Sequence, residues 1–100
     1  MLSSKISKYK FKTPILTASG TYGYGDEVKN LVNVEGLGGI VTKSVTLHPR
    51  EGNPPPRIAE TSSGMLNSIG LANLGVEQYI KDKIPQLNKL NTNIIINIAG

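Results

Sequence analysis

Lys43 stands at the end of the apolar run GGIVTK, directly before Ser44 and a proline-studded loop. A charge at the end of a buried strand must be solvated or paired with an opposite charge. Lys43 therefore either extends its long side chain to water or faces an anionic group. In the second case the lysine would stabilise a carboxylate or a developing negative charge. The residue types alone leave both interpretations open.

Small or polar residues also end the other two apolar runs of the chain. The complete set is Ala18, Ser19 and Gly20 in the first run, Lys43 and Ser44 in the second, and Asn97, Ala99 and Gly100 in the third. In open α/β sheets and in (β/α)₈ barrels, ligands bind at the carboxyl ends of the parallel strands. The three strand ends are therefore predicted to meet at one binding edge.

The loop SGTYGYGD, residues 19–26, carries glycines at positions 20, 23 and 25. This spacing is not G-x-G-x-x-G and no G-K-[ST] follows, so it gives weak support to a Walker or Rossmann phosphate site. The glycines either form a turn against a neighbouring segment or allow a flat ring to approach the backbone.

The segment SSGMLNSIGLANLG, residues 62–75, places Asn67 among small residues. An amide offers both a donor and an acceptor, which suits a ring that bears an imide. The alternative is an Asx-turn, in which the side chain bonds its own backbone. The single histidine, His48, precedes Pro49 and is expected to be a solvated loop residue. No metal-ligand spacing and no Ser-His-Asp set is present, and the absence of cysteine excludes a thiolate ligand or nucleophile within these residues.

Three apolar runs predict the strands that position these residues. Residues 8–12 alternate polar and aromatic positions, as in a half-exposed strand. Residues 14–19, 39–44 and 93–100 are nearly continuous apolar runs and predict buried strands. Such strands alternating with helices are typical of a parallel α/β sheet.

Two helices are predicted between the strands. The first begins at Asp26 as N-cap, with Val28, Leu31 and Val32 at helical spacing. The second has Asn73 as N-cap and a kink or break at Pro85. Its apolar positions are Val76, Tyr79, Ile80, Ile84 and Leu87. Residues 46–73 show no regular pattern, and three consecutive prolines at 54–56 predict a long, functional loop.

Composition narrows the class of protein. One hundred residues form at most one small domain, and no apolar run reaches the length of a spanning helix. The net charge of +4 is not accompanied by a basic stripe interleaved with aromatics, so nucleic-acid binding is not expected. The N-terminus lacks the apolar region of a signal peptide, and a cytoplasmic location is the default expectation. The last strand has no helix after it, so the chain is expected to be the front of a larger domain.

The quoted stretches resemble one family in order and over most of the chain from Pro14 onward. The matching segments are ASGTYGYG, GGIVTKSVTLHPREGNPPPRIAET, GMLNSIGLANLG and NIIINIAG. They resemble the dihydroorotate dehydrogenases, flavin enzymes of pyrimidine (UMP) biosynthesis. Within the family, NPPPRIAET and GMLNSIGL are similar to the NAD-linked class 1B catalytic subunits. The resemblance implies that residues 1–100 are the N-terminal segment of one FMN-binding (β/α)₈ TIM barrel domain, preceded by a short N-terminal β-hairpin or strand.

The resemblance also assigns roles to positions in this chain. Residues expected to bind FMN are Ala18, Ser19, Gly20, Lys43, Ser44 and Asn97. Residues expected to bind dihydroorotate are Lys43, Asn67, Ser68, Ile69, Gly70 and Leu71. No metal ligand is expected. The implied partner is an electron-transfer subunit with FAD and a [2Fe-2S] cluster, in a heterotetramer built on a homodimer of catalytic subunits, without nucleic acid or membrane.

The implied reaction is oxidation of (S)-dihydroorotate to orotate, with electrons passed from FMN through the partner to NAD+. The family's catalytic base is a cysteine on a later loop, and this chain has none. The 100 residues alone are therefore expected to be inactive. Two alternatives are a non-catalytic nucleotide- or phosphate-binding module and an inactive structural fragment.

Overall fold

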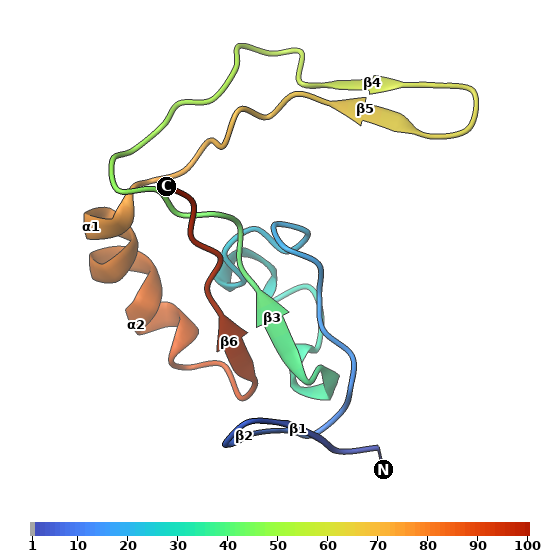
Figure 1. Ribbon diagram of the computed structural model, residues 1–100, viewed down its shortest axis with the longest axis vertical. Coiled ribbons are helices and arrows are strands. Elements are labelled where there is room, and N and C mark those ends of the chain that lie inside the picture. The colour runs from blue at the N-terminus through green and yellow to red at the C-terminus, as the bar shows by residue number, and fades with distance from the viewer. Residues whose placement is uncertain (1) are drawn as a thin grey trace.

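A computed structural model describes residues 2–100 (Figure 1). It contains three separate two-stranded sheets and one interrupted helix. The N-terminal hairpin consists of β1 (Ser4–Ile6) and β2 (Tyr9–Phe11), which pair antiparallel. The strand predicted at 8–12 is therefore confirmed, as one arm of that hairpin.

The central pair of strands is parallel, as predicted. β3 (Gly39–Val41) lies beside β6 (Asn93–Ile95), with Ile40 opposite Ile94. An isolated bridge continues the pairing from Val45 to Ile98 beyond the strands. Ile40 is fully buried, whereas β6 is only half-buried and Ile96 and Ile98 are 43% and 80% exposed. The predicted strand direction is therefore confirmed, but the predicted burial of residues 93–100 is wrong.

The first apolar run, residues 14–19, is a partial exception to the prediction. Leu16 bridges Gly39 in parallel, so this segment lies on the other side of β3 from β6. Only one bridge is formed, although backbone hydrogen bonds join Thr17 N–H to the Gly39 carbonyl and Gly38 N–H to the Ile15 carbonyl, and Ile15 remains 60% exposed. The prediction of a buried strand at 14–19 is therefore wrong, because little in the described part of the chain covers this segment.

One helix covers the parallel pair, running from 76 to 87 in three pieces. These are α1 (Val76–Gln78), the π-helical turn η3 (Tyr79–Lys83) and α2 (Ile84–Leu87). Pro85 lies in the first turn of α2, where its missing N–H removes an intrahelical bond. The wide turn just before Pro85 is the predicted break, and such bulges are a common cause of helix irregularity.

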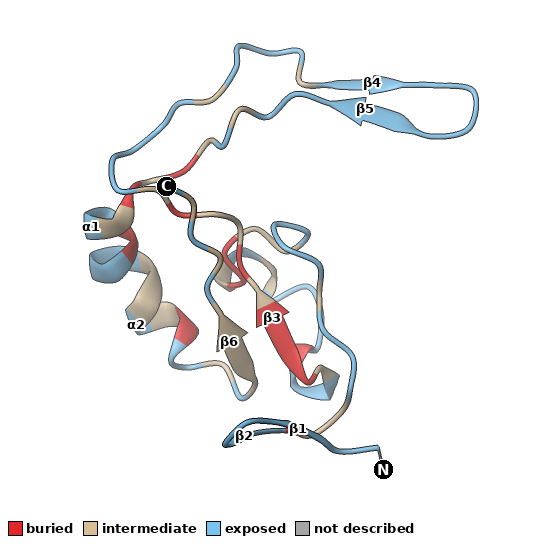
Figure 2. Ribbon diagram, in the orientation of Figure 1, coloured by how far each residue is buried: buried red, intermediate tan, exposed pale blue. Residues whose placement is uncertain are grey.

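The core lies between this helix and β3 and β6 (Figure 2). Its buried members are Tyr24, Val45, Tyr79 and Leu87, with Ile94 packed against them. The rings of Tyr24 and Tyr79 meet at 5.2 Å between centroids with a 50° tilt, which is a favourable aromatic geometry. The Gly-rich loop is thereby fastened to the helix.

The predicted helix after Asp26 is also wrong. Two short 3₁₀ turns occupy the region instead, η1 (Asp26–Val28) and η2 (Val34–Gly36). The N-cap position of η1 is Gly25, not Asp26. The Glu27 carboxylate turns back and accepts hydrogen bonds from the backbone N–H groups of Tyr24 and Gly25, each at 3.1 Å. This carboxylate caps the start of η1. Further along, the Asn33 amide oxygen accepts from the Glu35 N–H at 3.0 Å, and that local bonding competes with helix propagation.

The loop predicted at 46–73 contains a second hairpin that the sequence did not reveal. β4 (Ile58–Glu60) pairs antiparallel with β5 (Met65–Asn67), and every residue of both strands is exposed. Figure 1 shows this hairpin extending away from the rest of the protein. The Cα radius of gyration is accordingly 15.0 Å, against about 13 Å for a compact domain of 100 residues.

Gly38 lies against the backbone of Thr13 and Ile15, so replacing it tests how that segment packs beside β3. Its N–H donates to the Ile15 carbonyl at 2.8 Å, and a Cβ at this position would collide with the Thr13 carbonyl oxygen. Gly38→Ala is expected to destabilise the protein by about 2 kcal/mol, because the backbone must move apart. Thermal denaturation of the purified protein measures it. Gly36→Ala is the matched control, since nothing lies within 4 Å of its added methyl group; equal melting temperatures for the two variants would contradict the prediction.

Candidate functional site

The predicted strand ends meet through the side chain of Asn97. Its Nδ2 donates to Ser19 Oγ at 2.7 Å and to Ser44 Oγ at 2.9 Å. Ser19 Oγ in turn donates to the Thr42 carbonyl at 2.9 Å. One amide therefore ties together residues from three neighbouring chain segments, as the parallel arrangement predicted.

A cavity of about 170 Å³ opens beside this network. It is formed by two parts of the chain, the strand ends and the segment that follows β5. Its lining consists of Ser19, Gly20, Lys43, Ser44, Ile69, Leu71 and Ala72. Small-molecule sites are usually about 300–1,000 Å³, so the described residues form one wall of a site for anything larger than a fragment.

Lys43 is the only charged residue in the lining of this cavity. Its backbone N–H donates to the Gly23 carbonyl at 2.8 Å, which fixes the end of the strand against the Gly-rich loop. Its side chain is half-buried, and its Nζ lies 5.2 Å from the centroid of the Tyr24 ring. Between residues 2 and 100 the ion pairs all involve Lys83, so Lys43 presents an unpaired positive charge.

Gly20 packs directly against Lys43. Its φ of +78° is in the left-handed region, and a Cβ would lie 3.6 Å from the Lys43 Cβ. Space is therefore sufficient, and the backbone conformation is what favours glycine here. The turn brings Ser19 to the cavity wall.

Other predicted site residues lie outside the cavity lining, and Asn97 is one of them although it bonds two lining serines. Ala18 is exposed, and Asn67 ends β5 on the extended hairpin. Ser68 Oγ accepts from Asn53 Nδ2 at 2.7 Å, and its N–H donates to the Arg57 carbonyl at 2.8 Å. Gly70 also contacts Asn53. The Ser68 and Gly70 contacts bind the two halves of the long loop to each other.

Asn73 is a structural residue whose role the sequence did not reveal. It is buried and does not cap the helix, since the N-cap position of α1 is Gly75. Its Oδ1 accepts from the N–H groups of Thr46 at 3.1 Å and Gly75 at 2.9 Å. Its Nδ2 donates to the Leu71 carbonyl at 2.8 Å. Asn73 thus fastens the cavity-lining segment to the chain that follows Lys43.

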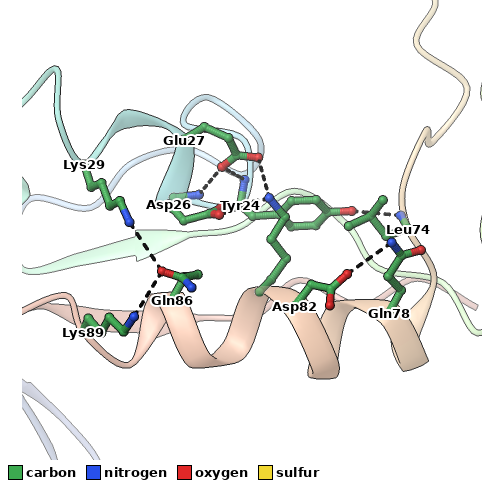
Figure 3. Close-up of polar contacts among 11 residues, drawn as sticks. Tyr24, Asp26, Glu27, Lys29, Leu74, Gln78, Asp82, Gln86 and Lys89 are labelled. Atoms are coloured by element: carbon green, nitrogen blue, oxygen red, sulfur yellow. Dashed lines mark hydrogen bonds and ion pairs between the residues drawn. The ribbon is translucent and has the colours of Figure 1, made fainter.

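Tyr24 is a second residue that the sequence analysis did not single out. Its hydroxyl accepts a hydrogen bond from the Leu74 N–H at 3.0 Å (Figure 3). Lys83 Nζ lies 5.2 Å from the ring centroid, and it pairs with Asp26 at 3.1 Å and with Glu27 at 3.5 Å. The signal in the sequence was the aromatic residue inside the glycine repeat, which is too short a pattern to assign a partner.

The Asp26–Lys83 pair shifts both ionisation equilibria. Burial alone would raise the pKa of Asp26, but its contacts with Glu27 and Lys83 and the charge of Lys83 bring it below the ordinary value of 3.8. Burial alone would lower the pKa of Lys83, and the two carboxylates raise it above 10.5. The pair is therefore fully charged, and stabilising, between those two values.

A pH series on Asp26→Asn tests this pair. Because the folded-state pKa of Asp26 is lowered, its contribution is present above the ordinary value of 3.8 and is lost as pH falls through the folded value. The variant is expected to be about 0.5–1 kcal/mol less stable than wild type at neutral pH. Denaturation curves should show this difference shrinking below about pH 4. A difference that stays constant down to pH 2 would contradict the assignment.

Tyr79 lies under the site with its phenol buried. Burial raises the pKa of Tyr79, and the neighbouring Thr42 hydroxyl offsets part of this effect.

Within residues 2–100, no three His, Asp or Glu side chains are grouped as metal ligands. The helix over 76–87 is the longest described and is too short to cross a bilayer.

Comparison with known proteins places the chain in a family. The family model for dihydroorotate dehydrogenase matches residues 1–100. The NAD+-dependent dihydroorotate dehydrogenase B catalytic subunit of Thermodesulfovibrio yellowstonii is 56% identical over all 100 residues, which cover 33% of that protein. The corresponding subunit of Bacteroides thetaiotaomicron is 48% identical over 99 residues, again covering 33% of its length.

A solved structure supports the fold. The crystal structure of DHODH from Eimeria tenella in complex with ferulenol matches with a TM-score of 0.67 over 97% of this chain and 28% of that chain. At 22% identity this likeness concerns the fold alone. The described elements are thus an α/β part of that fold. The chain spans about a third of the length of the curated relatives it matches. On the match over residues 1–100 and the identities of about one half, the chain belongs to the dihydroorotate dehydrogenase family.

Proposed function

We propose that this chain forms part of the active site of an NAD-linked dihydroorotate dehydrogenase that oxidises (S)-dihydroorotate to orotate. The names of its relatives, NAD+-dependent catalytic subunits, support this proposal. The observation that carries it is that Ser19, Lys43 and Ser44 line one cavity at the carboxyl ends of parallel segments, with Asn97 bonded to both serines. This is the edge at which barrel enzymes bind their ligands.

The cavity lining and the adjoining Asn97 fit one edge of a flavin such as FMN. Both Nδ2 hydrogens of Asn97 are used by the two serines, which leaves its Oδ1 free to accept from a ring N–H. The Ser44 hydroxyl and the Lys43 ammonium are free to donate, and Gly20 keeps the wall open. Ile69 and Leu71 supply an apolar surface for a ring face. When bound, FMN would supply the acceptor for a hydride from C6 of dihydroorotate, and a base would take the proton from C5.

Lys43 is proposed to contact both FMN and dihydroorotate. Its unpaired charge attracts the carboxylate of dihydroorotate and stabilises negative charge that develops during the reaction. Ile69 and Leu71 line the same cavity, and Asn67, Ser68 and Gly70 are proposed to complete the substrate side from the segment after β5. Ala18 and Gly20 are proposed to flank the flavin through their backbone. The chain has no cysteine, so the base that removes the C5 proton is assigned to a residue outside these 100.

The larger assembly is proposed from the same relationship. The relatives are named as catalytic subunits, which favours a separate electron-transfer subunit, here proposed to carry FAD and a [2Fe-2S] cluster. We propose a complete (β/α)₈ barrel, a homodimer of catalytic subunits within a heterotetramer, and a cytoplasmic location.

The test is an assay of the protein purified as it is expressed, together with its electron-transfer partner. Dihydroorotate is expected to bleach the flavin absorbance anaerobically, and NAD+ is expected to restore it with formation of one orotate per NADH. Fumarate in place of NAD+ is the control and is expected to support little turnover. A protein that binds no flavin, or a flavin that dihydroorotate does not reduce, would overturn the proposal.

A further inference from the structure

Tyr24 is in contact with two lysine side chains from different parts of the chain. Its ring is buried, with 4% of the residue exposed. The Nζ atoms of Lys43 and Lys83 each lie 5.2 Å from the ring centroid. This distance is within the range in which the negative face of an aromatic ring attracts a cation.

The two lysines differ in how their charges are balanced. Lys83 is paired with Asp26 and Glu27, whose carboxylates offset its charge. Lys43 has no such partner among residues 2–100 and lines the cavity. The carboxylates therefore limit the repulsion between the two ammonium groups, and the ring is the one fixed group found to attract the Lys43 ammonium in this part of the chain.

Tyr24 is held at three points, by its ring, its hydroxyl and its backbone. It packs against the Tyr79 ring, its hydroxyl accepts from the Leu74 N–H at 3.0 Å, and its backbone N–H donates to Glu27. A long lysine side chain has many rotamers, and ordering it costs conformational entropy. A fixed aromatic ring favours the rotamers that place the ammonium group over it. Less conformational entropy is then lost when a ligand binds to the lysine.

We propose that Tyr24 is a positioning residue for Lys43, holding the ammonium group at the cavity by a cation–π contact before an anionic ligand arrives. The proposal rests on the proposed function, in which Lys43 binds the carboxylate of dihydroorotate. Tyr24 does not line the cavity, so its effect on the reaction passes through Lys43. The Lys83–Asp26–Glu27 group fixes the same ring without adding net positive charge beside it.

A fluorination series measures this contact without changing the shape of the ring. Phenylalanine at position 24 is the reference, and mono-, di- and trifluorophenylalanine at the same position progressively weaken the ring's attraction for a cation. Orotate affinity and kcat/KM for dihydroorotate are expected to fall stepwise, by about 5-fold in total. The same series at Tyr9 is the matched control, because Lys8 Nζ lies 5.5 Å from that ring, away from the cavity. A flat series at position 24 would overturn the proposal.

A second measurement needs no activity. Lysines carrying ¹³C-methyl groups on Nζ report ring-current shifts by NMR, and the Lys43 signal is identified by its loss in Lys43→Met. It is expected to be displaced from the signals of exposed lysines in wild type and to return toward them in Tyr24→Leu. An undisplaced wild-type signal would overturn the positioning contact, whether or not the protein oxidises dihydroorotate.

A double-mutant cycle then separates positioning from general support of the fold. Tyr24→Leu is expected to lower kcat/KM about 5-fold in the wild-type background and to have almost no effect in the Lys43→Met background. Equal effects in both backgrounds would show a merely structural role and contradict the proposal. A failure of the proposed function can be told apart from a failure of the positioning contact. In the first case the wild-type protein would not oxidise dihydroorotate, but the Lys43 NMR signal would still be displaced.

Discussion

Replacing Lys43 by methionine is expected to lower kcat/KM for dihydroorotate by at least about 100-fold, the usual cost of removing one group that stabilises transition-state charge. Methionine keeps most of the side-chain volume and removes the charge. Lys43 is half-buried, unpaired and part of the cavity wall, so no described cation can replace it there. Orotate binding, followed by the change in flavin absorbance, is expected to weaken in parallel.

Lys81→Met is the matched control for this change. Lys81 is exposed in the helical segment 76–87, away from the cavity, so the variant loses the same charge without touching the site. Its kinetics are expected to match wild type. If Lys43→Met also retained wild-type kinetics, the assignment of Lys43 to the substrate carboxylate would be wrong.

Asn73→Ala is expected to destabilise the protein by about 3 kcal/mol. The change leaves the backbone N–H groups of Thr46 and Gly75 without their acceptor, and each buried unsatisfied donor costs about 1–3 kcal/mol. It also frees the Leu71 carbonyl, so the segment lining the cavity loses an anchor. Denaturant unfolding at two wavelengths measures the loss, and a weaker orotate affinity is expected to accompany it.

Two further variants sharpen this prediction. Asn73→Asp keeps an oxygen for both N–H groups but replaces the Nδ2 donor that faces the Leu71 carbonyl with a second carboxylate oxygen. Because that oxygen repels the carbonyl at a buried position, the variant is also expected to be destabilised, by at least about 1 kcal/mol. Asn30→Ala, at an exposed position, is expected to be neutral. If Asn73→Ala were as mild as Asn30→Ala, Asn73 would not be the anchor described above.

The parallel pairing of β3 with β6 was predictable because it depends on a strong, simple pattern. Nearly continuous runs of Ile and Val are typical of strands in parallel sheets, and the helical segment between β3 and β6 allows the two strands to run in the same direction. The same reasoning predicted that Ser19, Ser44 and Asn97 lie at one edge, because each residue stands at the carboxyl end of a parallel segment. Their hydrogen bonds confirm the predicted proximity.

The elements that the sequence did not predict depend on local backbone bonding or on distant contacts. β4 and β5 are exposed on both faces and are held by backbone pairing alone, so no apolar alternation marks them. The helix expected after Asp26 is replaced by 3₁₀ turns, the second of which begins where the Asn33 side chain binds the Glu35 N–H. Neither effect leaves a periodic signal.

The site residues that sequence reasoning missed show the same limit. Asn73 resembles an N-cap in the sequence, yet its amide bridges to Thr46, 27 positions earlier. The position of Tyr24 beside Lys43 depends on the turn at Gly20 and on the core contact with Tyr79. Short sequence patterns cannot specify such pairings, because they arise only when separate segments pack together.

A crystal structure of the expressed protein with orotate bound tests the proposed site most directly. The orotate carboxylate is expected within hydrogen-bond distance of Lys43 Nζ, and a flavin edge is expected to face Ser19, Ser44 and Asn97. Orotate bound at another place, with Lys43 turned to solvent and no flavin at the three strand ends, would contradict the proposed site.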